Sequence, residues 1–174
     1  MIDTSLMLPE HRLTGGDSEV GLDLLSLADD VRRFLLLHSW CTGIRALYYD
    51  RGFPKVAVFL ANIDSNGLAD PQVWVIVGDV PPMYLDTMDQ INGAEALLAY
   101  TFVYRTLLDA YSRNEPLTNL PPLVTSRSFH EMILNADVVK MLTSRLEFIE
   151  KLVDEYWSGE VRDELKEIIE NGNE

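Results

Sequence analysis

Two short apolar runs, VAVFLANI at residues 56–63 and QVWVIVGD at residues 72–79, constrain the fold of this chain most strongly. Both are rich in β-branched and aromatic side chains, which is typical of β-strands. Both are also apolar at odd and at even positions, although successive side chains of a strand point to opposite faces. These strands therefore require cover on both faces of their sheet, or a central position in it.

A third strand is predicted at residues 44–50, IRALYYD, and short connections join the three strands. Gly52 and Pro54 punctuate the first connection, RGFPK, and the second is DSNGLADP. Connections this short favour antiparallel pairing between successive strands. We expect an antiparallel sheet of three or four strands between residues 44 and 85.

Helices are predicted on both sides of this segment in the sequence. An N-terminal helix follows Ser26, which is placed to cap it. Asn92 and Glu95 form a variant capping box that opens a second helix, and Ser128 and Glu131 form a box that opens a third, ending near residue 157. The expected fold is α+β, with the sheet packed, largely on one face, by an N-terminal helix and two longer C-terminal helices.

The length of 174 residues and the apolar fraction of 47% predict one globular domain, over residues 1–158. Residues 1–16 mix Pro9 and two glycines with scattered apolar side chains and predict an irregular arm. Residues 159–174 are strongly acidic and predict a C-terminal helix or a frayed tail.

The charge balance limits the kinds of partner that the chain is expected to bind. The chain has 14 Lys and Arg against 28 Asp and Glu, a formal net charge of -14. This charge repels phosphate backbones and anionic lipids, so we expect no nucleic-acid partner and no membrane partner, and it favours a basic protein partner. The N-terminus has no basic region followed by a long apolar one, and Cys41 is the single cysteine, so we expect a cytoplasmic protein.

The stretch WVIVGDVPPMYL at residues 74–85 is the most distinctive in the chain. Gly78 and Asp79 end a predicted strand, and two prolines then prevent further pairing, which favours a structural corner. A functional interpretation makes Asp79 and Tyr84 a polar pair at a sheet edge. The pattern W-x-x-x-G-D-x-P-x-x-Y resembles a segment of uncharacterised bacterial proteins of similar size. The residues that match this pattern are Trp74, Gly78, Asp79, Pro81 and Tyr84. The resemblance implies a bacterial origin and no particular activity.

Arg145 is the third candidate residue, because it lies on the flank of an apolar helical face. Its head group either extends into water or pairs with a carboxylate near the sheet, for which Asp79 is the natural candidate. A structural pair is favoured over a ligand-binding role.

No catalytic, cofactor-binding or metal-binding residue is predicted. The sequence FHEMIL resembles the start of a zinc-binding HExxH helix, but Leu134 stands where the second histidine belongs. His38 and Cys41 are three residues apart, yet a lone cysteine beside a tryptophan is typical of a core. No phosphate-binding glycine loop or nucleophile elbow occurs, so no cofactor is expected.

Three functional hypotheses remain open. The leading one is a non-enzymatic, acidic protein-interaction module, of which an immunity-type protein is one version. The alternative is a small enzyme or ligand-binding protein with a pocket between sheet and helices, walled by aromatic residues. The third is a homodimer within a larger assembly, since the second helix is apolar over more than half of its circumference. In the hypothesis of an enzyme or ligand-binding protein, the aromatic residues that would wall the pocket are Tyr48, Tyr49, Trp74, Tyr84 and Tyr100.

Overall fold

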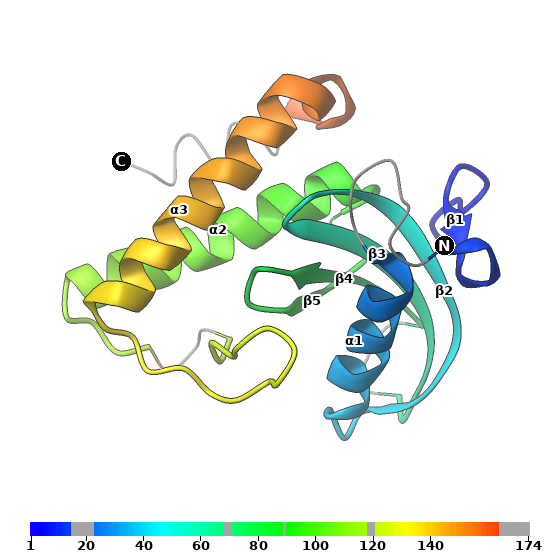
Figure 1. Ribbon diagram of the computed structural model, residues 1–174, viewed down its shortest axis with the longest axis horizontal. Helices are drawn as coiled ribbons and strands as arrows, with labels where there is room; N and C mark the ends of the chain where they lie inside the picture. Colours follow the sequence, from blue (N-terminus) through cyan, green and yellow to red (C-terminus); the bar gives the residue numbers. More distant parts are fainter. Residues whose placement is uncertain (15–22, 68–70, 89, 118–120, 164–174) are drawn as a thin grey trace.

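The computed structural model describes residues 1–14, 23–67, 71–88, 90–117 and 121–163 of the chain (Figure 1). The elements are β1 (Leu8–Pro9), η1 (Glu10–Arg12), α1 (Leu24–Leu36), β2 (Cys41–Phe53), β3 (Val56–Ser65), β4 (Gln72–Gly78), β5 (Met83–Asp86), α2 (Gly93–Ser112), α3 (Ala136–Leu152), η2 (Val153–Trp157) and η3 (Ser158–Glu160).

All five strands form one sheet in the order β1-β2-β3-β4-β5, and every pair of neighbours is antiparallel. The α+β class and the meander are confirmed, but the sheet has five strands rather than three or four. The additional strand is β1, in the N-terminal arm, where Leu8 pairs with Tyr49 and Pro9 with Tyr48. A strand of two residues is too short to leave an alternating pattern in the sequence.

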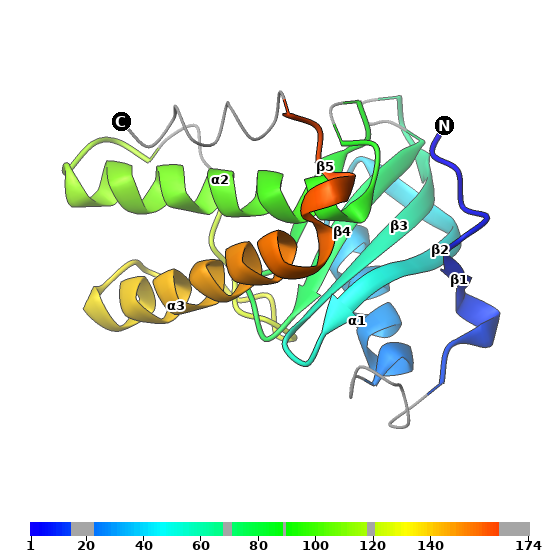
Figure 2. The ribbon, with the colours of Figure 1, turned by 90° about the horizontal axis from the view of Figure 1, so that it is seen from above.

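Two separate apolar cores cover the two faces of the sheet. Val58 and Leu60 of β3 belong to the core that contains α2 and α3, whereas Ala57 and Phe59 belong to the core that contains α1. Figure 2 shows α2 and α3 on one side of the sheet and α1 on the other. The expectation that all three helices lie largely on one face is therefore wrong. The unbroken apolar runs 56–61 of β3 and 73–77 of β4 reflect this cover on both faces.

Side-chain caps set the first residue of each long helix. Asp23 rather than Ser26 caps α1, because its carboxylate accepts a hydrogen bond from the Ser26 backbone N–H at 3.0 Å. Asn92 caps α2 as predicted. The predicted helix start at Ser128 is wrong, since α3 begins eight residues later and is capped by Asn135.

Beyond α3 the chain makes a π-helical turn (η2) and a 3₁₀ turn (η3). Val161, 5% exposed, packs in the same core as α2 and α3, so the packed chain continues past residue 158. The remainder of the predicted acidic tail, residues 164–174, lies outside the described residues. Within the described part of the chain, none of the helices has the length and apolar character that crossing a membrane requires.

Candidate functional site

Gly78 turns the chain at the end of β4 in a conformation that suits only glycine. Its φ is +129°, and a Cβ atom there would lie 2.6 Å from the Lys55 carbonyl oxygen. The Asp79 N–H donates to this same oxygen at 2.8 Å. Two residues later, the buried Tyr100 hydroxyl donates to the Pro81 carbonyl at 2.9 Å. These contacts account for the corner by structure alone, and the peptide bonds before both prolines are trans.

Asp79 and Arg145 form the ion pair that the sequence predicted. Arg145 Nη2 lies 2.5 Å from Asp79 Oδ2, and Arg145 Nε donates to the Asp79 carbonyl oxygen at 3.0 Å. The Asp79 side chain is 58% exposed and the Arg145 side chain 21%. The pair joins α3 to the corner after β4, and exposed pairs of this kind contribute about 0–1 kcal/mol to stability.

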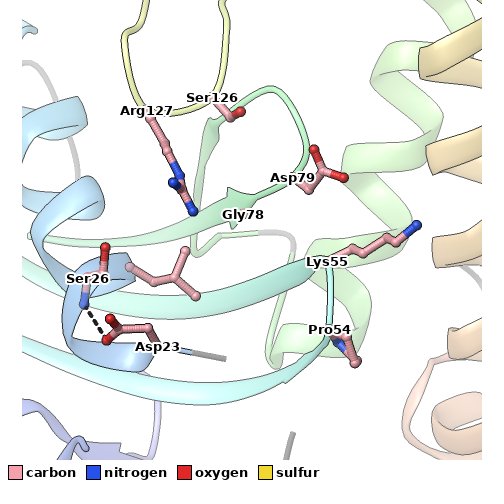
Figure 3. Close-up of a pocket in the computed structure, with 9 residues that line it drawn as sticks. Asp23, Ser26, Pro54, Lys55, Gly78, Asp79, Ser126 and Arg127 are labelled. Atoms are coloured by element: carbon pink, nitrogen blue, oxygen red, sulfur yellow. Dashed lines mark hydrogen bonds between the residues drawn. The ribbon is translucent and has the colours of Figure 1, made fainter. Parts of the chain in front are cut away.

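Asp79 also lines a polar pocket of about 320 Å³ beside the corner. Figure 3 shows the Arg127 side chain extending towards Ser26 in the first turn of α1, whereas the Lys55 side chain extends away from Ser26. The charged side chains that line the pocket therefore include both signs and point in different directions. Such an arrangement does not converge on one atom of a substrate.

Tyr84 lies in a different environment from Asp79, at the centre of an aromatic cluster. Its ring centroid lies 4.7 Å from that of Trp40, 4.9 Å from that of His38 and 6.4 Å from that of Phe34. Phe34 in turn contacts Phe129 at 5.6 Å. We call Phe34, His38, Trp40, Tyr84 and Phe129 the aromatic cluster. The structure thus separates the two members of the predicted polar pair.

All members of the aromatic cluster except Trp40 line an apolar groove with a volume of about 570 Å³. Its walls are the C-terminal end of α1, strand β5 with the preceding Pro82, Val103 of α2, and the segment 121–129. None of the described residues that line it is Asp, Glu, Lys or Arg. Its polar groups are the Tyr84 hydroxyl and the His38 ring, whose Nδ1 lies 3.0 Å from the Phe34 carbonyl oxygen. Because a carbonyl oxygen only accepts, Nδ1 donates, which leaves Nε2 as an acceptor in the neutral ring.

The far wall of the groove is a compact loop, residues 121–132, which we call the facing loop; in Figure 1 it is yellow and lies beside β5 and α1. Val124 and Glu131 form an antiparallel bridge, and the Thr125 N–H donates to the His130 carbonyl at 2.8 Å. Arg127 and Phe129 have positive φ values of 67° and 56°. Positive φ is costly for residues other than glycine and persists where the surrounding contacts impose it. The facing loop is therefore a fixed wall.

Of the five aromatic residues predicted to wall a pocket, the groove uses only Tyr84. Trp74 and Tyr100 are fully buried in the core beneath α2 and α3, and Tyr48 packs against that same core. Tyr49 packs against the α1 core, where desolvation raises the pKa of its hydroxyl to about 12.

Sequence reasoning missed the groove residues Leu37 and Phe129 and gave His38 no role in a groove. No motif in the sequence links these positions. Cys41 is buried, and desolvation raises the pKa of its thiol, which fits the core role predicted for it.

A second polar cluster, absent from the sequence predictions, lies where the C-terminal segment crosses the start of α2. Glu95 is 0% exposed and accepts from Arg162 Nε at 2.8 Å and from the Ile91 N–H at 2.8 Å. Arg51 of β2 donates to Glu160 at 2.8 Å. We call this network the C-terminal clamp. The Glu95 and Glu160 carboxylates accept hydrogen bonds from arginines of the same chain, so we interpret the C-terminal clamp as a structural feature.

Comparison of this chain with protein-family models, with curated proteins and with solved structures gives no match. Within the described ranges, no three His, Cys, Asp or Glu side chains are grouped so that they could hold a metal ion. The site is therefore interpreted from its own geometry, in which the apolar groove is the most developed feature.

Proposed function

We propose that this chain is a non-enzymatic binding module that holds an extended apolar segment of a partner protein in the groove beside β5. The observation that carries the proposal is the groove itself. Its volume of about 570 Å³ lies within the range of roughly 300–1,000 Å³ that is usual for ligand sites. Among the described residues its lining is aromatic and aliphatic, and its polar side chains, those of His38 and Tyr84, can orient a ligand.

The shape of the groove supports recognition rather than catalysis. The hydrogen bonds within the facing loop hold the far wall in place, so a segment would enter a largely preformed site and the loop would lose little conformational entropy. The charged residues nearby line the polar pocket instead, where they diverge (Figure 3).

The net charge supports a partner that is basic outside the bound segment. A chain with charge -14 attracts basic proteins over long range and associates with them faster. An immunity-type protein that neutralises a basic toxin is one version of such a module.

A charge placed in the groove wall tests the proposal. Leu37 lines the groove and is 64% exposed, so Leu37→Arg introduces a cation at little cost to folding. Leu36→Arg is the matched control, because Leu36 is 54% exposed and lies outside the groove lining. A phage library of random dodecapeptides is selected on the parent protein, and the enriched peptides are measured against both variants.

We expect the selected peptides to bind the parent and Leu36→Arg equally and to lose about tenfold or more in affinity on Leu37→Arg, since they would bury an unpaired charge. Equal binding by both variants, or a selection that yields no peptide, contradicts the proposal. If apolar fragments such as indole bind the groove by NMR while no peptide does, the alternative of a small-molecule site is correct instead.

A further inference from the structure

We infer that the bound segment pairs with β5 as a sixth strand of the sheet, an inference that rests on the proposed function. β5 is the last strand in the sheet order and pairs with β4 along one edge only. In an antiparallel pair, every second residue directs its N–H and C=O away from its partner strand. Across the described residues, no backbone hydrogen bond joins residues 83–86 to any segment other than β4. Within the part of the chain that the structure describes, the outer edge of β5 therefore has main-chain donors and acceptors without a backbone partner.

The groove is lined from both faces of the sheet, as a site for an added strand must be. Tyr84 lies opposite Val75, a residue of the α1 core. Met83 lies opposite Ile76, a residue of the core beneath α2 and α3. Both Tyr84 and Met83 line the groove, as do Phe34 of α1 on one side and Val103 of α2 on the other.

An extended segment beside β5 would alternate its side chains in the same way. One set would contact the aromatic cluster, and the other set would contact Met83, Leu85 and Val103. A pocket for alternate side chains together with a free main-chain edge is the arrangement by which β-strand addition achieves both affinity and specificity. A groove on one face of the sheet would instead be lined by only one of these sets.

The facing loop explains why this edge remains open. Pro121 and Pro122 lie across the groove from β5 and have no N–H to donate to it. The loop therefore cannot use these residues to complete the sheet. Because facing-loop residues line the groove opposite an edge of only four residues, we expect a segment with free ends to fit it better than the edge of a second folded sheet. A second copy of this chain is thus a poor occupant, and self-association would use another surface.

The chemistry of the segment follows from this geometry. Four residues of β5 span about 13 Å, so four to six residues of the partner would pair with it. Apolar side chains suit alternate positions in a groove without charged lining. Lys or Arg suits the flanks, because the chain is acidic overall and Asp86 is exposed at the end of β5.

N-methylation of the peptide backbone tests strand addition. The tightest-binding dodecapeptide from the selection described above is synthesised in two forms, one methylated at odd and one at even positions of its central six residues. Both forms carry the same conformational restriction, but only one set of N–H groups can donate to β5. We expect one form to lose about tenfold or more in affinity and the other to retain most of it. Amide hydrogen exchange should slow within residues 83–86 when the unmodified peptide binds.

The outcomes distinguish this inference from the proposed function. If both methylated forms bind like the parent peptide, or residues 83–86 gain no protection, strand addition is wrong, while groove binding stands as long as Leu37→Arg weakens it. If Leu37→Arg has no effect on any selected peptide, the proposed function fails and strand addition in this groove fails with it.

Discussion

Arg162 and Arg145 both bind a carboxylate beside the helical layer formed by α2 and α3, and the two carboxylates, unlike the arginines (41% and 21% exposed), lie in opposite surroundings. Arg162 binds Glu95, which is fully buried, whereas Arg145 binds Asp79, whose side chain is 58% exposed. Glu95 accepts hydrogen bonds from the arginine and from the backbone of Ile91. The Asp79 carboxylate is exposed to solvent, so its charge loses little stabilisation when Arg145 is removed.

The difference shows that the two pairs have different energetic roles although their geometry is similar. Removing one partner of a buried pair leaves an uncompensated charge and costs about 3–5 kcal/mol, whereas an exposed pair contributes about 0–1 kcal/mol. We therefore expect the C-terminal clamp to contribute more to stability than the Asp79–Arg145 pair does.

The largest effect is expected for Arg162→Met. The substitution keeps an unbranched apolar side chain but leaves the buried Glu95 carboxylate with two backbone donors and no cation, namely the Ile91 N–H at 2.8 Å and the N–H of residue 162 at 3.3 Å. We expect the free energy of unfolding in urea to fall by about 3 kcal/mol. Glu95→Gln in the Arg162→Met background should recover part of the loss, because it removes the buried charge. A loss below about 1 kcal/mol for Arg162→Met would show that Glu95 is not held in this way.

Gly78→Ala is expected to have the next largest effect, because the corner depends on this residue more than on the Asp79 pair. A Cβ atom would meet the Lys55 carbonyl at 2.6 Å, and φ is +129°. We expect a loss of about 2–3 kcal/mol, measured by urea unfolding. Gly67→Ala is the matched control, since its φ is +87° but no atom lies within 4 Å of the added Cβ. Equal losses in the two variants would mean that the close approach at Gly78 is unimportant.

A smaller effect is expected for Asp79→Ala. The variant removes the ion pair but keeps the Asp79 carbonyl, to which Arg145 Nε also donates. The free energy of unfolding should fall by less than about 1 kcal/mol, and peptide affinity at the groove should not change, because Asp79 lines the polar pocket. Loss of peptide binding with unchanged stability would restore the functional interpretation of Asp79.

The smallest effect is the salt dependence of the exposed pair. Double-mutant cycles give a coupling energy for each pair, and at 1 M salt the Debye length falls to about 3 Å. We expect the Asp79–Arg145 coupling to lose about 0.5 kcal/mol between low salt and 1 M NaCl, while the Glu95–Arg162 coupling is retained. Equal salt dependence would contradict the contrast between the two pairs.

The central strands and the start of α2 could be predicted because their signals are local. Cover on both faces requires the unbroken apolar run 56–61 of β3, and Asn92 caps the α2 backbone within three residues. Ser128 and Glu131 imitate such a cap, but residues 125–130 bond to one another in the facing loop instead. Side-chain hydrogen bonds of this kind stabilise turns as well as helix starts, so the pattern alone cannot distinguish them.

The groove and the C-terminal clamp could not be predicted because their residues meet only through the fold. Phe34 and Phe129 come from α1 and the facing loop and read in the sequence as ordinary apolar residues, whereas Tyr84 of β5 is predicted as a candidate but with no link to either of them. Glu95 reads as a cap residue on a polar flank, and its burial depends on Arg162, which is 67 residues away. The Asp79–Arg145 pair is equally distant, but it was predicted because an arginine on an apolar helix flank requires a partner.

The separation of Glu95 and Arg162 also bears on how the chain assembles during synthesis. Glu95 leaves the ribosome 67 residues before Arg162, and for that interval its carboxylate has no cation to accompany it into the interior. The paired strands and α1 lie entirely within residues 8–86 and leave the ribosome earlier, but one face of the sheet stays uncovered until α2 and α3 follow. The first turn of α2 closes only when the segment beyond α3 arrives. We therefore expect the Glu95–Arg162 pair, which seals the helical layer, to form in the last stage of assembly during synthesis.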